Sequence, residues 1–113
     1  MHEISIVYKI MEMIEGICRE NNILKVNKVI LNIGELTAIE KETLSFAFNS
    51  LKKNTNCSEA LLEVNSIKAM AYCKICKKEF FISFVNRQCP NCHTYSDNIV
   101  SGKEILLYRI EGE

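Results

Sequence analysis

The sequence lacks the net positive charge that binding to polyanions requires. It also lacks an apolar segment long enough to cross a membrane. Its 113 residues carry 14 basic and 14 acidic side chains, so the formal net charge is zero. A neutral chain has no electrostatic footprint for nucleic acid or for an anionic membrane. The longest apolar run is far shorter than the roughly 20 residues that a membrane span needs. We therefore expect a protein that neither binds nucleic acid nor enters a membrane.

Features typical of enzymes and of exported proteins are missing as well. Neither of the two histidines has a nucleophile or carboxylate partner at a motif spacing, and no glycine-rich phosphate loop is present. Charged side chains, Lys9 and Glu12 among them, interrupt any apolar core of a secretion signal. We expect a cytoplasmic protein that is not an enzyme. In that reducing compartment its six cysteines are thiols or metal ligands rather than disulfides.

What is present is the pattern of a small α+β protein. Apolar side chains recur at helical spacing in two segments, 3–20 and 37–54. The second segment opens with Thr37 and Glu40, which have the form of a capping box. Alternating apolar residues predict three strands, at 24–36, 60–72 and 103–112. The fold class that follows is two helices on a three-stranded sheet.

A cysteine-rich insert separates the last two predicted strands. We expect an α/β domain made of residues 1–72 and 103–113, and a metal-binding module made of residues 73–102. The two strands that flank the insert can pair antiparallel, because a compact excursion brings its ends together. The only proline, Pro90, lies inside the insert.

The insert has the spacing of a four-cysteine zinc site. Cys73 and Cys76 form one Cys-x-x-Cys pair, and Cys89 and Cys92 form a second pair twelve residues later. Two such turns facing each other give tetrahedral sulfur coordination, which suits zinc. The intervening residues 78–88 fit the short hairpin of a zinc ribbon or knuckle module. Such a site has no open position for a substrate, so its role is structural.

Other uses of these cysteines are less consistent with the pattern. Cys89 to His93 match the c-type haem attachment pattern, but that assignment leaves the first pair unexplained. A thioredoxin-like redox pair lacks its strand-to-helix context. Iron bound as in rubredoxin stays open, because four sulfurs alone do not select zinc over iron. Of the remaining cysteines, Cys18 falls on the apolar face of the first helix, and Cys57 lies in a polar loop without an assigned role.

The amino terminus offers a second metal-binding arrangement. The α-amine of Met1, the backbone nitrogen of His2 and the His2 imidazole can close a five- and a six-membered chelate ring in one plane. That geometry favours Ni(II) or Cu(II), and Glu3 could fill a further position. The simpler alternative is an exposed histidine beside a glutamate that complements the helix dipole. Residue chemistry alone leaves both interpretations open.

Three features taken together resemble one family. The N-terminal "MHE" before an amphipathic helix, the "IGEL" at 33–36, and the paired Cys-x-x-Cys insert occur in the order and spacing of the HypA/HybF family. The resemblance covers essentially the whole chain. It implies a nickel chaperone for maturation of [NiFe]-hydrogenases, which in some members also supplies urease.

The resemblance implies roles for particular residues. His2 matches the nickel ligand of the family, with the Met1 amine and the backbone nitrogens of His2 and Glu3 as co-ligands. Glu40 falls where relatives carry an acidic residue near the nickel site. His93 resembles a position where histidine often flanks the zinc site. The structural zinc ligands of the family are matched by Cys73, Cys76, Cys89 and Cys92.

The resemblance also implies partners. They are the GTPase HypB and the hydrogenase large subunit, with urease accessory proteins as further candidates. Both a monomer and a homodimer fit the sequence. The residues alone allow a second class, a zinc-ribbon nucleic-acid-binding or adaptor protein. Only residues 73–81 have the local basic and aromatic character that this alternative needs.

Overall fold

The computed structural model describes residues 3–113 and shows two compact units. The first unit comprises residues 3–31, 39–65 and 106–113, and the second comprises residues 32–38 and 66–105. Both units therefore combine segments that are distant in the sequence. The expectation that residues 73–102 form a metal-binding module of their own stays a prediction.

Helix α1, Glu3–Asn21, confirms the first expected helix. Its apolar face is buried and consists of Ile6, Val7, Ile10, Ile14 and Cys18. The helix ends where Asn22 adopts a left-handed conformation with φ of 56°, which asparagine tolerates better than most residues. The N–H of Ile23 then donates to the carbonyl of Cys18 at 2.9 Å. No helix in residues 3–113 combines the length and the apolar character that crossing a membrane requires.

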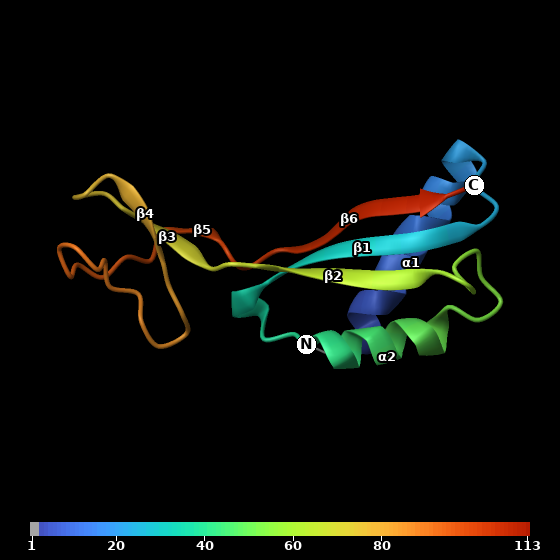
Figure 1. Cartoon of the computed structure of the whole chain (residues 1–113), viewed down its shortest axis with the longest axis horizontal. Coiled ribbons are helices and arrows are strands. Elements are labelled where there is room, and N and C mark those ends of the chain that lie inside the picture. Colours follow the sequence, from blue (N-terminus) through green and yellow to red (C-terminus); the bar gives the residue numbers. More distant parts are fainter. Residues whose placement is uncertain (1–2) are drawn as a thin grey trace. The chain divides into compact units, whose positions relative to one another are not determined.

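The expected three-stranded sheet is present, in the order β2-β1-β6. Its strands are β1 (Val26–Gly34), β2 (Leu61–Ile67) and β6 (Ile105–Gly112), which run side by side in Figure 1. The expected pairing of the two strands that flank the insert is wrong here, because β1 lies between β2 and β6. Six of the nine β1 residues are buried, which suits the central position of a sheet.

The start of the second helix differs from the capping-box prediction. A 3₁₀ turn (Glu35–Thr37) comes first, Ala38 is left-handed with φ of 58°, and α2 covers Lys41–Leu51. Glu40 is the N-cap residue but makes no side-chain capping bond. The Thr37 hydroxyl instead donates to the carbonyl of Gly34 at 2.8 Å. The capping box is therefore wrong, because the left-handed Ala38 separates Thr37 from the helix.

The core of the first unit lies between the two helices and the sheet. α1 and α2 pack against each other, and Leu44, Ala47 and Phe48 are the buried residues of α2. Cys18 is buried as expected. Cys57 lies in the polar turn that the sequence indicates, but its own side chain is only 1% exposed. Burial, reinforced by nearby Cys18, raises the pKa of Cys57 to about 11, so this thiol stays protonated.

The strand predicted at 60–72 is two strands. β2 ends at Ile67, and β3 (Met70–Cys73) belongs to a second sheet with the order β4-β3-β5. The other members are β4 (Lys78–Phe81) and β5 (Ile99–Ser101), both antiparallel to β3. The hairpin expected at residues 78–88 is also wrong. β4 pairs with β3, the strand that precedes it in the chain. The first Cys-x-x-Cys pair therefore lies at the turn of the β3–β4 hairpin.

Candidate metal centre

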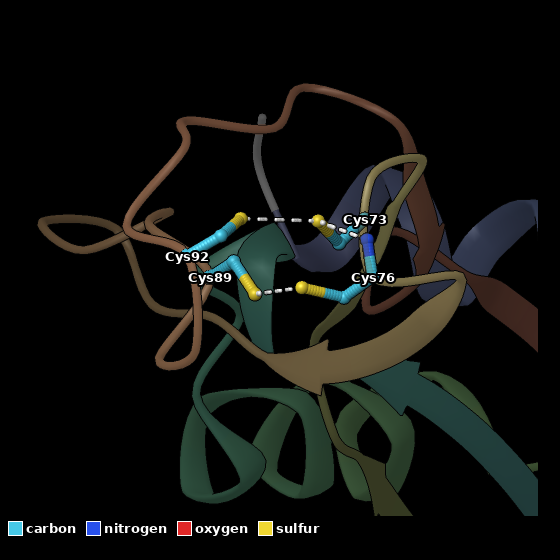
Figure 2. A group of neighbouring side chains, drawn as sticks. All are labelled: Cys73, Cys76, Cys89 and Cys92. Atoms are coloured by element: carbon cyan, nitrogen blue, oxygen red, sulfur yellow. Dashed lines mark hydrogen bonds between the residues drawn. The ribbon is translucent and has the colours of Figure 1, made fainter.

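The four cysteines of the insert converge on one point in the second unit. Each offers one sulfur, and all four sulfurs lie within 4.8 Å of one another. Cys73 and Cys89 are buried, whereas Cys76 and Cys92 are half-buried. Figure 2 shows the two pairs facing each other across a small gap. The convergence predicted from the two Cys-x-x-Cys turns is confirmed.

The sulfur positions match tetrahedral coordination of one ion. Cys73 Sγ is 3.6 Å from Cys92 Sγ, and Cys89 Sγ is 3.8 Å from Cys76 Sγ. Four sulfurs about 2.3 Å from a central Zn²⁺ would lie ~3.8 Å apart at the corners of a tetrahedron. Each of the two short contacts joins one sulfur from each turn (Figure 2). The gap therefore has the size of a four-sulfur zinc site.

Both cysteine turns have the same backbone construction. In the first, Cys73 pairs with Lys78, and the N–H of Lys77 donates to the Cys73 carbonyl at 2.7 Å. In the second, the N–H of Cys89 donates to the Thr94 carbonyl at 3.0 Å, and the N–H of His93 donates to the Cys89 carbonyl at 2.8 Å. We call these two turns, residues 73–77 and 89–93, the first and second knuckles.

Each knuckle ends in a strained residue. Lys77 and His93 follow the second cysteine of their knuckles and have φ of 57° and 62°. A left-handed conformation costs a side-chain-bearing residue roughly 1–2 kcal/mol. It turns the chain sharply enough to aim both sulfurs of a knuckle at one centre. His93 therefore closes the second knuckle through its backbone, and its side chain is not a member of the metal-ligating group found in residues 3–113.

Hydrogen-bond donors of the second knuckle favour thiolates. The hydroxyl and N–H of Thr94 lower the pKa of Cys92 to about 6. The backbone N–H groups of Cys92 and Asn91 lower the pKa of Cys89. The Asn91 amide also lowers the pKa of Cys76, but the neighbouring thiols and burial outweigh it, and the net pKa is about 11. A bound cation would displace the remaining proton, because metals take cysteine as thiolate.

A small apolar cluster packs against the four cysteines and fixes their positions. Cys73 and Cys89 are themselves part of it, together with Ala69, Ala71, Phe80 and Ile82. Because two ligands also belong to the apolar core, metal binding and packing hold the same residues in place. The donor set fits structural zinc: four sulfurs, two of them buried, with amide donors nearby and no open coordination position.

The structure describes two of the residues predicted to bind nickel, Glu3 and Glu40. Met1 and His2 lie outside the described residues. Glu3 is the first residue of α1 and is half-buried. Glu40 is exposed at the start of α2 and takes part in none of the ion pairs within residues 3–113. The nickel site proposed from sequence therefore remains a prediction.

Two residues beside the zinc ligands were not singled out from the sequence. Asn91 points its amide nitrogen at Cys76 Sγ, 3.6 Å away in the other knuckle. Thr94, just beyond the second knuckle, lowers the pKa of Cys92. The sequence did contain a signal for both, because polar side chains within or next to a Cys-x-x-Cys turn lie within reach of sulfur.

The fold and the site define a class of protein. An α+β unit with its own core, together with a unit whose four cysteine sulfurs converge as in a closed zinc site, is the architecture of a small metal-binding protein. The model of one family, described as "Hydrogenase/urease nickel incorporation, metallochaperone, hypA", matches residues 1–112. The chain belongs to this HypA family of nickel metallochaperones for hydrogenase maturation.

Relatives and solved structures agree with this assignment. The chain is 37% identical to the hydrogenase maturation factor HypA of Aquifex aeolicus, covering 100% of this chain and 98% of that one. It is 34% identical to HypA of Francisella philomiragia, with 97% of each chain covered. The solution structure of the Ni metallochaperone HypA from Helicobacter pylori matches with a TM-score of 0.71 and 28% identity, over 99% of this chain and 97% of that chain.

Proposed function

We propose that this protein captures Ni(II) at its amino terminus and delivers it during maturation of a [NiFe]-hydrogenase, and in some hosts to urease. The observation that carries the proposal is the family match, which begins at residue 1 and so includes the Met-His-Glu start. The zinc site supports it indirectly. Because four sulfurs close that site, a cargo ion needs other ligands.

The chemistry of the first residues suits nickel. The Met1 amine, the His2 amide nitrogen and the His2 imidazole would bind in one plane, a geometry that Ni(II) accepts readily. The amide nitrogen of Glu3, or the carboxylate of Glu3 or Glu40, would complete the ligand set. Ligand exchange with a docked partner would then release the ion. In this mechanism the protein breaks no substrate bond, so we propose that it is not an enzyme, and we place it in the cytoplasm.

Replacement of His2 tests the nickel site directly. His2→Ala should abolish stoichiometric nickel binding and leave zinc content unchanged, because the imidazole is removed while all four sulfurs remain. The measurement is a nickel titration by calorimetry together with metal analysis, on protein with an untagged amino terminus.

His93→Ala is the matched control for this test, because His93 is the only other histidine in the chain. That variant should titrate with nickel as the parent protein does. An unchanged nickel titration in His2→Ala would refute the assignment of the amino-terminal site.

Delivery requires a docking surface, and α1 provides a suitable one. A hollow of 310 Å³ lies between α1 and the segment after α2, with Tyr8, Met11 and Leu51 among its lining residues. A second hollow next to it shares Tyr8, Glu12 and Leu51 and continues to Ile4, close to the amino terminus. We propose that this α1 groove, made of the two hollows, binds the partner GTPase HypB. The hydrogenase large subunit would be the final acceptor of the nickel ion. Urease accessory proteins would use the same groove where urease is a client.

Tyr8→Glu should weaken binding to HypB of the same organism by at least tenfold. Tyr8 is 59% exposed and lines both hollows, so a carboxylate there would oppose burial of an apolar partner side chain. Met13→Glu is the matched control, because Met13 is 53% exposed on the same helix but lines neither hollow. Equal affinity of both variants by calorimetry would reject the groove as the docking surface.

A further inference from the structure

The two knuckles share a backbone but differ in the side chain at their third position. In the first knuckle that residue is Ile75, whose side chain is 67% exposed. In the second it is Asn91, whose amide nitrogen lies 3.6 Å from Cys76 Sγ in the first knuckle. The second knuckle therefore supplies a side-chain donor to a sulfur of the first. Ile75 cannot return such a hydrogen bond, because its side chain has no donor group.

Donors to the four sulfurs are unevenly distributed. Cys73 Sγ accepts the N–H of Cys76 at 3.4 Å, and backbone N–H groups lower the pKa of both cysteines of the second knuckle. Cys76 differs from these three. Among residues 3–113 the Asn91 amide is the only nitrogen that donates a hydrogen bond to its sulfur. The charge on a metal-bound Cys76 thiolate would thus depend on one side chain for its hydrogen-bond support.

We propose that Asn91 is a positioning residue of the zinc site, whose amide spans the two knuckles and keeps the Cys76 thiolate on the metal. An N–H donor to a thiolate makes a charge-assisted hydrogen bond, which is stronger than one between neutral groups. Such outer partners orient the ligand, and their removal typically costs ten- to a hundredfold in metal affinity. This assignment does not depend on nickel binding at the amino terminus.

The rate of zinc loss tests this role. Asn91→Ala should release zinc to an excess of a chromogenic chelator about tenfold faster than the parent protein at the same pH. Ile75→Ala is the matched control, because it shortens the corresponding side chain of the other knuckle, which has no donor group to offer a sulfur. That variant should release zinc at the parental rate.

A second variant and a spectrum separate positioning from general damage. Asn91→Asp keeps the shape of the side chain but replaces the N–H donors with a carboxylate, so it should release zinc at least as fast as Asn91→Ala. In both variants loaded with Co(II), the sulfur-to-cobalt charge-transfer band should keep the parental intensity, which reports four bound thiolates.

Two results would overturn the proposal. One is release from Asn91→Ala and Asn91→Asp within twofold of the parental rate. The other is equal acceleration in Ile75→Ala, which would show that any shortened knuckle side chain loosens the site. If Asn91→Ala does not fold, Asn91→Asp decides between the outcomes by the same rate measurement.

Discussion

Cys89→Ser should abolish zinc binding and unfold the second unit while α1 stays folded. Cys89 is 3% exposed and belongs both to the ligand set and to the apolar cluster beneath it. That cluster is small, and two of its six buried residues are cysteine ligands. A core of this size does not usually hold a unit together without a metal or disulfides. Structural zinc binding contributes roughly 10–16 kcal/mol of folding free energy at neutral pH in small zinc modules. Loss of zinc should therefore be enough to unfold the second unit.

Amide NMR spectra and zinc analysis would measure both effects. Signals from residues 66–105 should collapse to unfolded positions, whereas those of α1 should keep their dispersion. Cys57→Ala is the control, because Cys57 is a buried thiol of the first unit and lies outside the four-sulfur group. It should retain one zinc per chain. A dispersed spectrum for residues 66–105 in zinc-free Cys89→Ser would contradict the expectation.

The same site should lose zinc as the pH falls. Zinc takes all four cysteines as thiolates, so protons compete with the metal. Without metal, the pKa of Cys76 is raised to about 11, and zinc must displace its proton at neutral pH. Hydrogen bonds from Thr94 lower the pKa of Cys92 to about 6, so this sulfur competes for protons only below that pH. Zinc affinity should therefore decrease with falling pH, and more steeply below about pH 6.

The fold was predictable from the sequence where one periodicity dominates. α1 keeps a helical apolar pattern over about five turns, and Cys18, predicted on its apolar face, is buried. The errors lie where tertiary contacts override a local pattern. Residues 60–72 look like one strand, yet the backbone leaves the first sheet after Ile67 and joins the second at Met70. Nothing in local alternation marks that change of partner, because both segments have ordinary strand composition.

The four-cysteine cluster was predictable because two equal Cys-x-x-Cys spacings define a geometry by themselves. The residues that contact these cysteines were not predictable, because the Asn91 amide donates to the sulfur of Cys76, 15 positions away in the sequence. Gly34 illustrates the same limit. The sequence identifies it only as the end of a strand within "IGEL", and its φ of −73° is one that any residue can adopt. The requirement for glycine at this position arises from a neighbouring backbone that the sequence does not show.

Gly34→Ala should strongly destabilise the second unit, by about 3 kcal/mol or more, the range of severe steric damage. A Cβ at Gly34 would lie 2.1 Å from the backbone carbon and oxygen of Gly102. Backbone atoms cannot rotate away as a flexible side chain can, so the two segments would have to separate. That movement would break the bond from the N–H of Gly34 to the Glu104 carbonyl, at 2.8 Å, and the bond from the N–H of Leu36 to the Gly102 carbonyl, at 2.7 Å.

Gly16→Ala is the matched control, because the same methyl group should there have the opposite effect. Gly16 lies inside α1, and a Cβ added to it meets no heavy atom within 4 Å. Alanine is favoured over glycine within a helix by about 0.8–1 kcal/mol. Thermal unfolding of the zinc-loaded proteins should therefore show a Tm lowered by more than 10 °C for Gly34→Ala and raised by a few degrees for Gly16→Ala, at roughly 4–8 °C per kcal/mol. Equal Tm values would mean that the Gly34 backbone can move away from Gly102 without losing the second unit's hydrogen bonds.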